Sequence, residues 1–143
     1  MSARLVRLVY VSTATVPVDQ EALQAILTDA STKNAGNGIT GVLCASRDHY
    51  LQLLEGRAHQ VLDRYLRIVT DPRHRDPTLL SISLTAERLF GQWSMAYVNG
   101  SAHAGHLRGL RGTTLRAGAS LGVAAGAVRR LRDLAAGAAR GPQ

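Results

Sequence analysis

Residues 39–54 read ITGVLCASRDHYLQLL, and this stretch decides the fold. Two apolar runs, 39–45 and 49–54, flank the short polar connection Ser46-Arg47-Asp48. Short apolar runs bounded by polar residues are typical of β-strands, and two strands joined this closely pair in antiparallel fashion. The stretch therefore predicts a β-hairpin.

The segments around this hairpin alternate between strand and helix patterns. Residues 5–12 form a β-branched run, which places Val6, Leu8, Tyr10 and Ser12 on one face because strand side chains alternate. Apolar spacing predicts the other elements, which are helices over 19–32 and 59–70 and strands over 79–86 and 94–98.

Polar and glycine-rich stretches separate these elements. Asp19 stands where an acidic residue favours the start of a helix. Residues 34–38, NAGNG, predict the end of the first helix and a turn. Gly56 predicts a corner, and residues 71–77, DPRHRDP, predict a proline-bounded loop.

The order β-α-β-β-α-β is the ferredoxin-like pattern of an α+β domain. It predicts an antiparallel sheet with two helices on one face, followed by a C-terminal helical extension. A groove between the helices would suit a flat ligand. The pattern alone identifies no function, because this fold carries many.

The net charge of +7 is concentrated in residues 101–143, which hold seven Arg and one Asp. We expect residues 1–100 to form the folded domain and 101–143 an Ala-, Gly- and Arg-rich helical extension that packs against the sheet or a second subunit. A basic tail could also attract nucleic acid, but it lacks aromatic residues to stack on bases. A solubilising surface is the simpler interpretation.

The cysteine content and the apolar segments indicate the compartment. Cys44 is the only cysteine, so it forms no internal disulfide, and it has no metal-ligand spacing around it. Arg7 interrupts the apolar N-terminus, which argues against a signal peptide, and no run is long enough to span a membrane. We expect a cytoplasmic protein without a membrane segment or a metal.

Five segments in register resemble the BLUF family of blue-light sensors. They are LVYVS at 8–12, Asn34 followed by GITG at 38–41, YLQLLEG at 50–56, DPRH at 71–74, and RLFGQWSM at 88–95. The resemblance covers residues 4–98 and does not extend into the tail. It implies a non-enzymatic photoreceptor that binds FAD non-covalently between the two helices. FMN stays open beside FAD, because phosphate and adenine contacts leave little mark on the sequence.

The resemblance also assigns roles to individual residues. Tyr10 and Gln52 match the family's photoactive pair, whose hydrogen bonds to the flavin rearrange in light. Trp93 and Met95 match alternative occupants of a place near the glutamine, from which the signal leaves. The other cofactor-binding positions that the resemblance implies are Ser12, Ile26, Lys33, Asn34, Arg73 and His74. Ala30, Ala45 and Tyr50 depart from the family's usual residues and leave the pocket shape open.

The residue chemistry fits these roles. A phenol is an oxidisable proton donor, and a carboxamide carries a donor and an acceptor that rotation exchanges. Each residue also has an ordinary structural interpretation, since Tyr10 could be a core aromatic, Asn34 a helix cap and Trp93 a core anchor. Gln52 is less ordinary, because a buried amide must find hydrogen-bond partners.

Two other function classes are alternatives to a photoreceptor. An acyl-phosphate hydrolase on this fold needs a glycine-rich phosphate cradle with an arginine, and Thr13–Pro17 after the first strand offers none. A flavin-free module that binds a regulator or nucleic acid through the tail is the main alternative. For the photoreceptor, we expect output through a homo-oligomer or a separate signalling partner.

Overall fold

The computed structural model describes residues 4–91 and 94–99. Trp93 and the expected extension at 101–143 lie outside these residues. The elements, in chain order, are β1 (Leu5–Ala14), α1 (Gln20–Gly36), β2 (Thr40–Ala45), β3 (His49–Arg57), α2 (Ala58–Ile68), β4 (His74–Thr85) and β5 (Ala96–Asn99). No helix in this described part of the chain has the length and apolar character needed to cross a bilayer.

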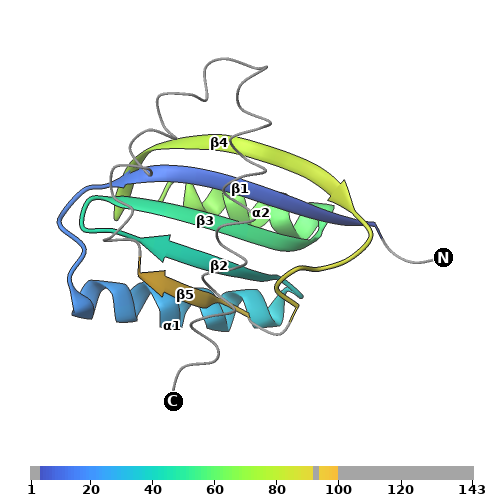
Figure 1. The fold of residues 1–143 in the computed structure, drawn as a ribbon, viewed down its shortest axis with the longest axis horizontal. Helices are drawn as coiled ribbons and strands as arrows, with labels where there is room; N and C mark the ends of the chain where they lie inside the picture. Colours follow the sequence, from blue (N-terminus) through green and yellow to red (C-terminus); the bar gives the residue numbers. More distant parts are fainter. Residues whose placement is uncertain (1–3, 92–93, 100–143) are drawn as a thin grey trace.

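The sheet has the strand order β4-β1-β3-β2-β5, with both helices on one side (Figure 1). β1 and β3 lie at its centre and pair in antiparallel register, which sets Tyr10 directly opposite Gln52. β2 and β3 form the predicted hairpin. The predicted α+β sheet with two helices on one face is confirmed.

The core lies between the sheet and the helices. Val6, Leu8 and Tyr10 face it from β1, as the strand alternation predicts. Their packing partners on α1 and α2 repeat at helical spacing, and they are Leu23, Ile26, Leu27 and Ala30 on α1 and Val61, Tyr65 and Ile68 on α2. Asp19 caps α1 as predicted, since its carboxylate accepts a hydrogen bond of 2.7 Å from the Ala22 amide.

The predicted loop at 71–77 was wrong in its second half. β4 begins at His74, because β1 extends to Ala14 and pairs with it. The register of this pair shifts near Asp76, which has a φ of 51°. Pro77 is tolerated there because β4 is an edge strand with an irregular register. A second correction concerns β5, which pairs with β2 in parallel and so departs from the predicted antiparallel sheet.

The predicted ends of the first helix and third strand were also wrong. α1 continues through Asn34 to Gly36, and Asn37 forms its C-cap. The left-handed φ of 65° at Gly38 then turns the chain into β2. Gly56 marks no corner, because it lies within β3 opposite Val6. A Cβ there would lie 3.1 Å from the Gly38 carbonyl oxygen, so glycine permits a close approach.

Substituting Gly41 with alanine should destabilise the sheet. A Cβ at Gly41 would collide with the backbone carbonyl oxygen of Leu53 on β3, which cannot move without disturbing the strand pairing. We expect a loss of about 1–3 kcal/mol in the free energy of unfolding, as for other overpacked sites. Urea titration of the purified protein measures this loss.

Gly36→Ala is the matched control. A Cβ at Gly36 meets no atom within 4 Å, and alanine is the better helix former. Its unfolding midpoint should equal or exceed that of the wild type. Equal stability of Gly41→Ala and the wild type would contradict the proposed close contact.

Candidate functional site

The centre of the site is a buried tyrosine–glutamine pair. Tyr10 on β1 and Gln52 on β3 face each other across the strands, on the side that the helices cover. The Tyr10 hydroxyl donates a hydrogen bond of 2.5 Å to Gln52 Oε1. Only 3% of Tyr10 and 5% of Gln52 is exposed, so water does not compete for this bond.

Burial controls the protonation of this pair. It raises the pKa of Tyr10 well above the ordinary phenol value, and the nearby Tyr65 adds to the increase while the charge of Arg64 opposes it. The Tyr65 ring centroid lies 5.4 Å from that of Tyr10. Tyr10 is therefore a neutral phenol that holds its proton toward the glutamine.

The other end of the Gln52 amide contacts Met95. Gln52 Nε2 donates to the Met95 sulfur at 3.7 Å, and Met95 is 9% exposed. A thioether is a weak acceptor, so this contact is easily exchanged for a better one. Met95 is the last residue before β5, so the amide connects Tyr10 to the edge of the sheet.

A cavity of about 550 Å³ lies beside the pair, and its size suits a small organic ligand. Tyr10, Gln52 and Leu43 line it from the sheet. The helices and the chain that follows α2 provide most of the remaining wall. The residues from α1 are Ile26, Asp29, Ala30 and Lys33. The residues from α2 and the chain after it are Asp63, Arg64, Arg67, Ile68, Thr70, Asp71, Arg73 and His74.

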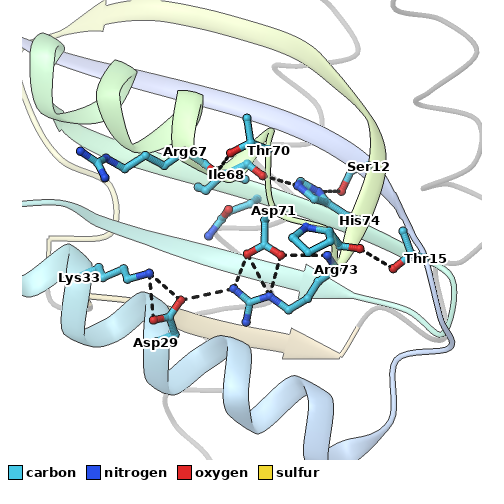
Figure 2. Close-up of polar contacts among 12 residues, drawn as sticks. Ser12, Thr15, Asp29, Lys33, Arg67, Ile68, Thr70, Asp71, Arg73 and His74 are labelled. Carbon is cyan, nitrogen blue, oxygen red and sulfur yellow. Dashed lines mark hydrogen bonds and ion pairs between the residues drawn. The ribbon is translucent and has the colours of Figure 1, made fainter.

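A chain of ion pairs connects the two sides of this cavity (Figure 2). Arg73 binds Asp71 at 2.5 Å and reaches Asp29 on α1 at 3.4 Å, and Asp29 also pairs with Lys33 at 3.1 Å. The Arg73 hydrogen bond lowers the pKa of Asp71. Bonds from Lys33 and Arg73 lower the pKa of Asp29, although partial burial opposes them. These groups are partly exposed, so their ion pairs contribute little to stability and mainly fix the positions of the side chains at the cavity rim.

Ser12 and His74 interact with each other. His74 Nε2 lies 2.5 Å from the Ile68 carbonyl oxygen, which can only accept, so this nitrogen carries a proton. His74 Nδ1 lies 2.7 Å from Ser12 Oγ (Figure 2). Ser12 is fully buried and does not line the cavity, so its hydroxyl orients the histidine.

Asn34 also lies behind the cavity wall. Its side chain is fully buried, and Nδ2 donates to the Ser94 carbonyl oxygen at 2.9 Å. Asn34 Oδ1 is buried without a hydrogen-bond partner in the described structure. An unsatisfied buried oxygen is costly, so it marks a place where a ligand donor would be stabilised.

Sequence reasoning missed Arg64, Asp29 and Asp71 in the cavity wall. Arg64 Nε is buried and has no hydrogen-bond partner among the described residues. Asp29 could have been found, because it lies at helical spacing between Ile26 and Lys33 on the same face. Of the eight cofactor-binding positions expected from the sequence, six line the cavity, namely Tyr10, Ile26, Lys33, Gln52, Arg73 and His74.

Comparison with known proteins places this site in a family. Residues 5–96 match the family described as sensors of blue light using FAD, BLUF. Photoactivated adenylate cyclase subunit beta of Euglena gracilis is 38% identical over 92 residues, which are 64% of this chain and 11% of that protein. The chain therefore spans about a tenth of the length of that curated relative.

Solved structures agree with this match. BlrB, a BLUF protein in its dark state, has a TM-score of 0.65 and 26% sequence identity, over 85% of this chain and 92% of that chain. A bacterial light-regulated adenylyl cyclase has a TM-score of 0.64 and 31% identity, over 66% of this chain and 28% of that chain.

Proposed function

Because this chain belongs to the BLUF family of blue-light sensors, we propose that it is a photoreceptor that holds a flavin in the cavity between α1 and α2. The observation that carries the proposal is the buried bond from Tyr10 to Gln52 at the wall of that cavity. A bound flavin absorbs blue light and, once excited, becomes a strong one-electron oxidant. Tyr10 lines the cavity and is an oxidisable group with a proton to release.

The described residues fit a flavin. Asn34 does not line the cavity, but its unpaired Oδ1 just behind the wall would suit an imide N–H, which a flavin ring carries. Arg73 would donate to a ring carbonyl, and Ile26 would pack on the ring from α1. His74, oriented by Ser12, would close the same side, and Lys33 would stand at the rim. The apolar core residues that line the inner wall, among them Ala30 and Leu43, would shield that side of the ring from water.

The switch would lie in the Gln52 amide. In the structure Oε1 accepts from Tyr10 and Nε2 faces Met95. Rotation or tautomerisation of the amide exchanges its donor and acceptor, so a change at Tyr10 alters the contact with Met95. Hydrogen bonds are stronger in a site without water, so such an exchange can favour one of two conformations of the protein over the other. Met95 is thus the proposed exit for the signal, with Trp93 as its alternative.

The charges of the cavity favour a flavin that carries phosphate. The other cations of the wall each face a carboxylate, in the pairs Lys33–Asp29, Arg67–Asp63 and Arg73–Asp71. Arg64 has no ion pair among the described residues, so the cavity wall has one uncompensated positive charge. We propose FAD as the cofactor in accordance with the family description, with Arg64 donating to an anionic part of it.

Arg64→Gln should weaken binding of FAD or FMN by about tenfold to a hundredfold, the cost of a lost charge-assisted hydrogen bond. Binding of riboflavin, which lacks phosphate, should change little. Fluorescence titration of the apoprotein with each flavin measures the three affinities. Arg67→Gln is the control, because Arg67 is exposed and already paired with Asp63. An equal loss for riboflavin would show that Arg64 contacts the ring or maintains the fold instead.

The remaining proposals concern the whole chain. We propose that residues 1–100 form the sensor and that 101–143 form the extension, and that the output passes through a homo-oligomer or a separate partner in the cytoplasm. We propose no catalytic activity, because BlrB, a BLUF protein, matches this chain over 92% of its own length. Binding of nucleic acid by the basic tail is the less favoured role.

One experiment tests the photoreceptor. The purified full chain should be yellow, and blue light should shift its absorption slightly to the red, with thermal return in darkness. Denaturation should release the flavin, and chromatography identifies it as FAD or FMN. A colourless protein that binds no added flavin would refute the proposal and favour the flavin-free module.

A further inference from the structure

A buried carboxylate on the far side of β3 holds the chain that follows β4. Glu55 is fully buried and accepts three hydrogen bonds. Oε2 accepts from the Leu89 amide at 2.9 Å and from Arg7 Nε at 2.9 Å, and Oε1 accepts from the Phe90 amide at 2.8 Å. Hydrogen bonds to a carboxylate in a dry setting are among the strong ones in proteins.

Two arginines fasten the same segment, residues 87–90, which we term the anchor segment. Arg7 on β1 donates to the Glu87 carbonyl oxygen at 3.2 Å. Arg88 donates to Thr40 Oγ1 at 2.8 Å, to the Gly38 carbonyl oxygen at 2.8 Å and to the Glu55 carbonyl oxygen at 3.1 Å. The anchor segment is therefore tied to β1, β3 and the start of β2, and Glu55 lies at the centre of these ties.

The anchor segment leads to the proposed exit of the signal. Met95 follows Phe90 by only five residues, and its sulfur meets the Gln52 amide. Gln52 and Glu55 lie three residues apart on β3, with their side chains on opposite faces of the sheet. One strand thus carries both the amide that rearranges and the carboxylate that fixes the chain leading to Met95.

We propose that Glu55 is a positioning residue of the light switch, an inference that rests on the proposed photoreceptor function. Its carboxylate prevents the anchor segment from moving with Met95, so a rearranged Gln52 amide displaces Met95 against β5. Without these bonds the anchor segment would move together with Met95, and β5 would not be displaced. Glu55 does not touch the cavity, so it leaves the colour change at the flavin unaffected.

The test compares the colour change with the change in β5. Hydrogen exchange of peptides covering residues 94–99 is measured on the flavin-loaded full chain in darkness and under blue light. The wild type should show the red shift and a light-induced change in exchange. Glu55→Gln, whose amide group cannot accept from both backbone amides, should keep the red shift and lose most of the exchange change.

Val9→Ala is the control for a general loss of stability, since Val9 is buried at 1% exposure in β1. It should lower the melting temperature and keep the exchange change. The proposal is overturned if Glu55→Gln retains the full exchange change, if Val9→Ala loses it equally, or if the wild type shows a red shift without any change in 94–99. A wild type without a red shift refutes the photoreceptor function itself.

Arg88→Met provides a second variant in case Glu55→Gln does not fold. It keeps the aliphatic stem and removes three hydrogen bonds from the anchor segment, while the Glu55 carboxylate stays paired with Arg7. The exchange change in 94–99 should fall only in part, because the Glu55 carboxylate still holds the Leu89 and Phe90 amides, and the red shift should remain. A full exchange change in Arg88→Met would count against the proposal by the same criterion.

Discussion

Gln52→Leu is expected to leave the flavin bound and to abolish its light-induced red shift. Leucine has a similar size and keeps the apolar wall of the cavity, but it offers Tyr10 no acceptor and Met95 no donor. The amide is the group that can exchange donor for acceptor, so without it light has no hydrogen-bond rearrangement to drive. The difference between absorption spectra before and after blue light should be flat.

Tyr50→Phe is the matched control for Gln52→Leu. Tyr50 also lines the cavity, yet no hydrogen bond of its hydroxyl is part of the Tyr10–Gln52 pair. Tyr50→Phe should keep the red shift at near wild-type amplitude.

Gln52→Leu should also lower the free energy of unfolding by about 1–3 kcal/mol, because it leaves the buried Tyr10 hydroxyl unpaired. A normal photocycle in Gln52→Leu would overturn the assigned role of the amide.

The centre of the fold was accessible from local patterns. Alternation in residues 5–12 predicts which β1 side chains face the helices, and the short connection at 46–48 predicts the hairpin. The structure places the helix-facing residues as expected. These features depend on neighbouring residues along the chain, which is why the sequence alone predicts them.

The errors occurred where partners distant in sequence decide the structure. His74 lies in a polar, proline-bounded stretch, yet it joins a strand because Ala14 on β1 pairs with it. Asn34 resembles a helix cap, yet its amide bonds Ser94, sixty residues later, and the helix continues past it. Neither contact has a local signal in the sequence.

The candidate site likewise combines residues that the sequence indicated with residues whose role depends on the fold. The five segments in register indicated Tyr10 and Gln52, and the pairing of β1 with β3 then brings their side chains into contact. Arg64 escaped notice because an arginine on a helix is ordinarily solvated. Its proposed role depends on the buried Nε and on the lack of an ion pair among the described residues, and both become apparent only in the folded structure.

Tyr10→Phe should bind flavin and show no red shift, because the ring keeps its packing against Tyr65 but loses its oxidisable O–H group. Light-minus-dark spectra measure this loss. The loss of the 2.5 Å bond also leaves Gln52 Oε1 without its donor, at a cost of about 1–3 kcal/mol in unfolding free energy. A wild-type red shift in Tyr10→Phe would exclude Tyr10 as the electron and proton donor.

The alkaline pH dependence separates the chemical role of Tyr10 from its structural one. Burial raises the pKa of Tyr10 in the folded state above the unfolded value of about 10. Its contribution to stability is therefore complete below pH of about 10 and is lost as the pH rises beyond that value, because only the unfolded chain then releases the proton. Wild-type stability should fall more steeply above this pH than that of Tyr10→Phe, while the red shift stays constant below it. The partly buried Tyr65, whose pKa burial also raises, titrates in both proteins, so most of its contribution cancels in the comparison. Parallel stability profiles for the two proteins would show that burial does not raise the pKa of Tyr10 in the folded state.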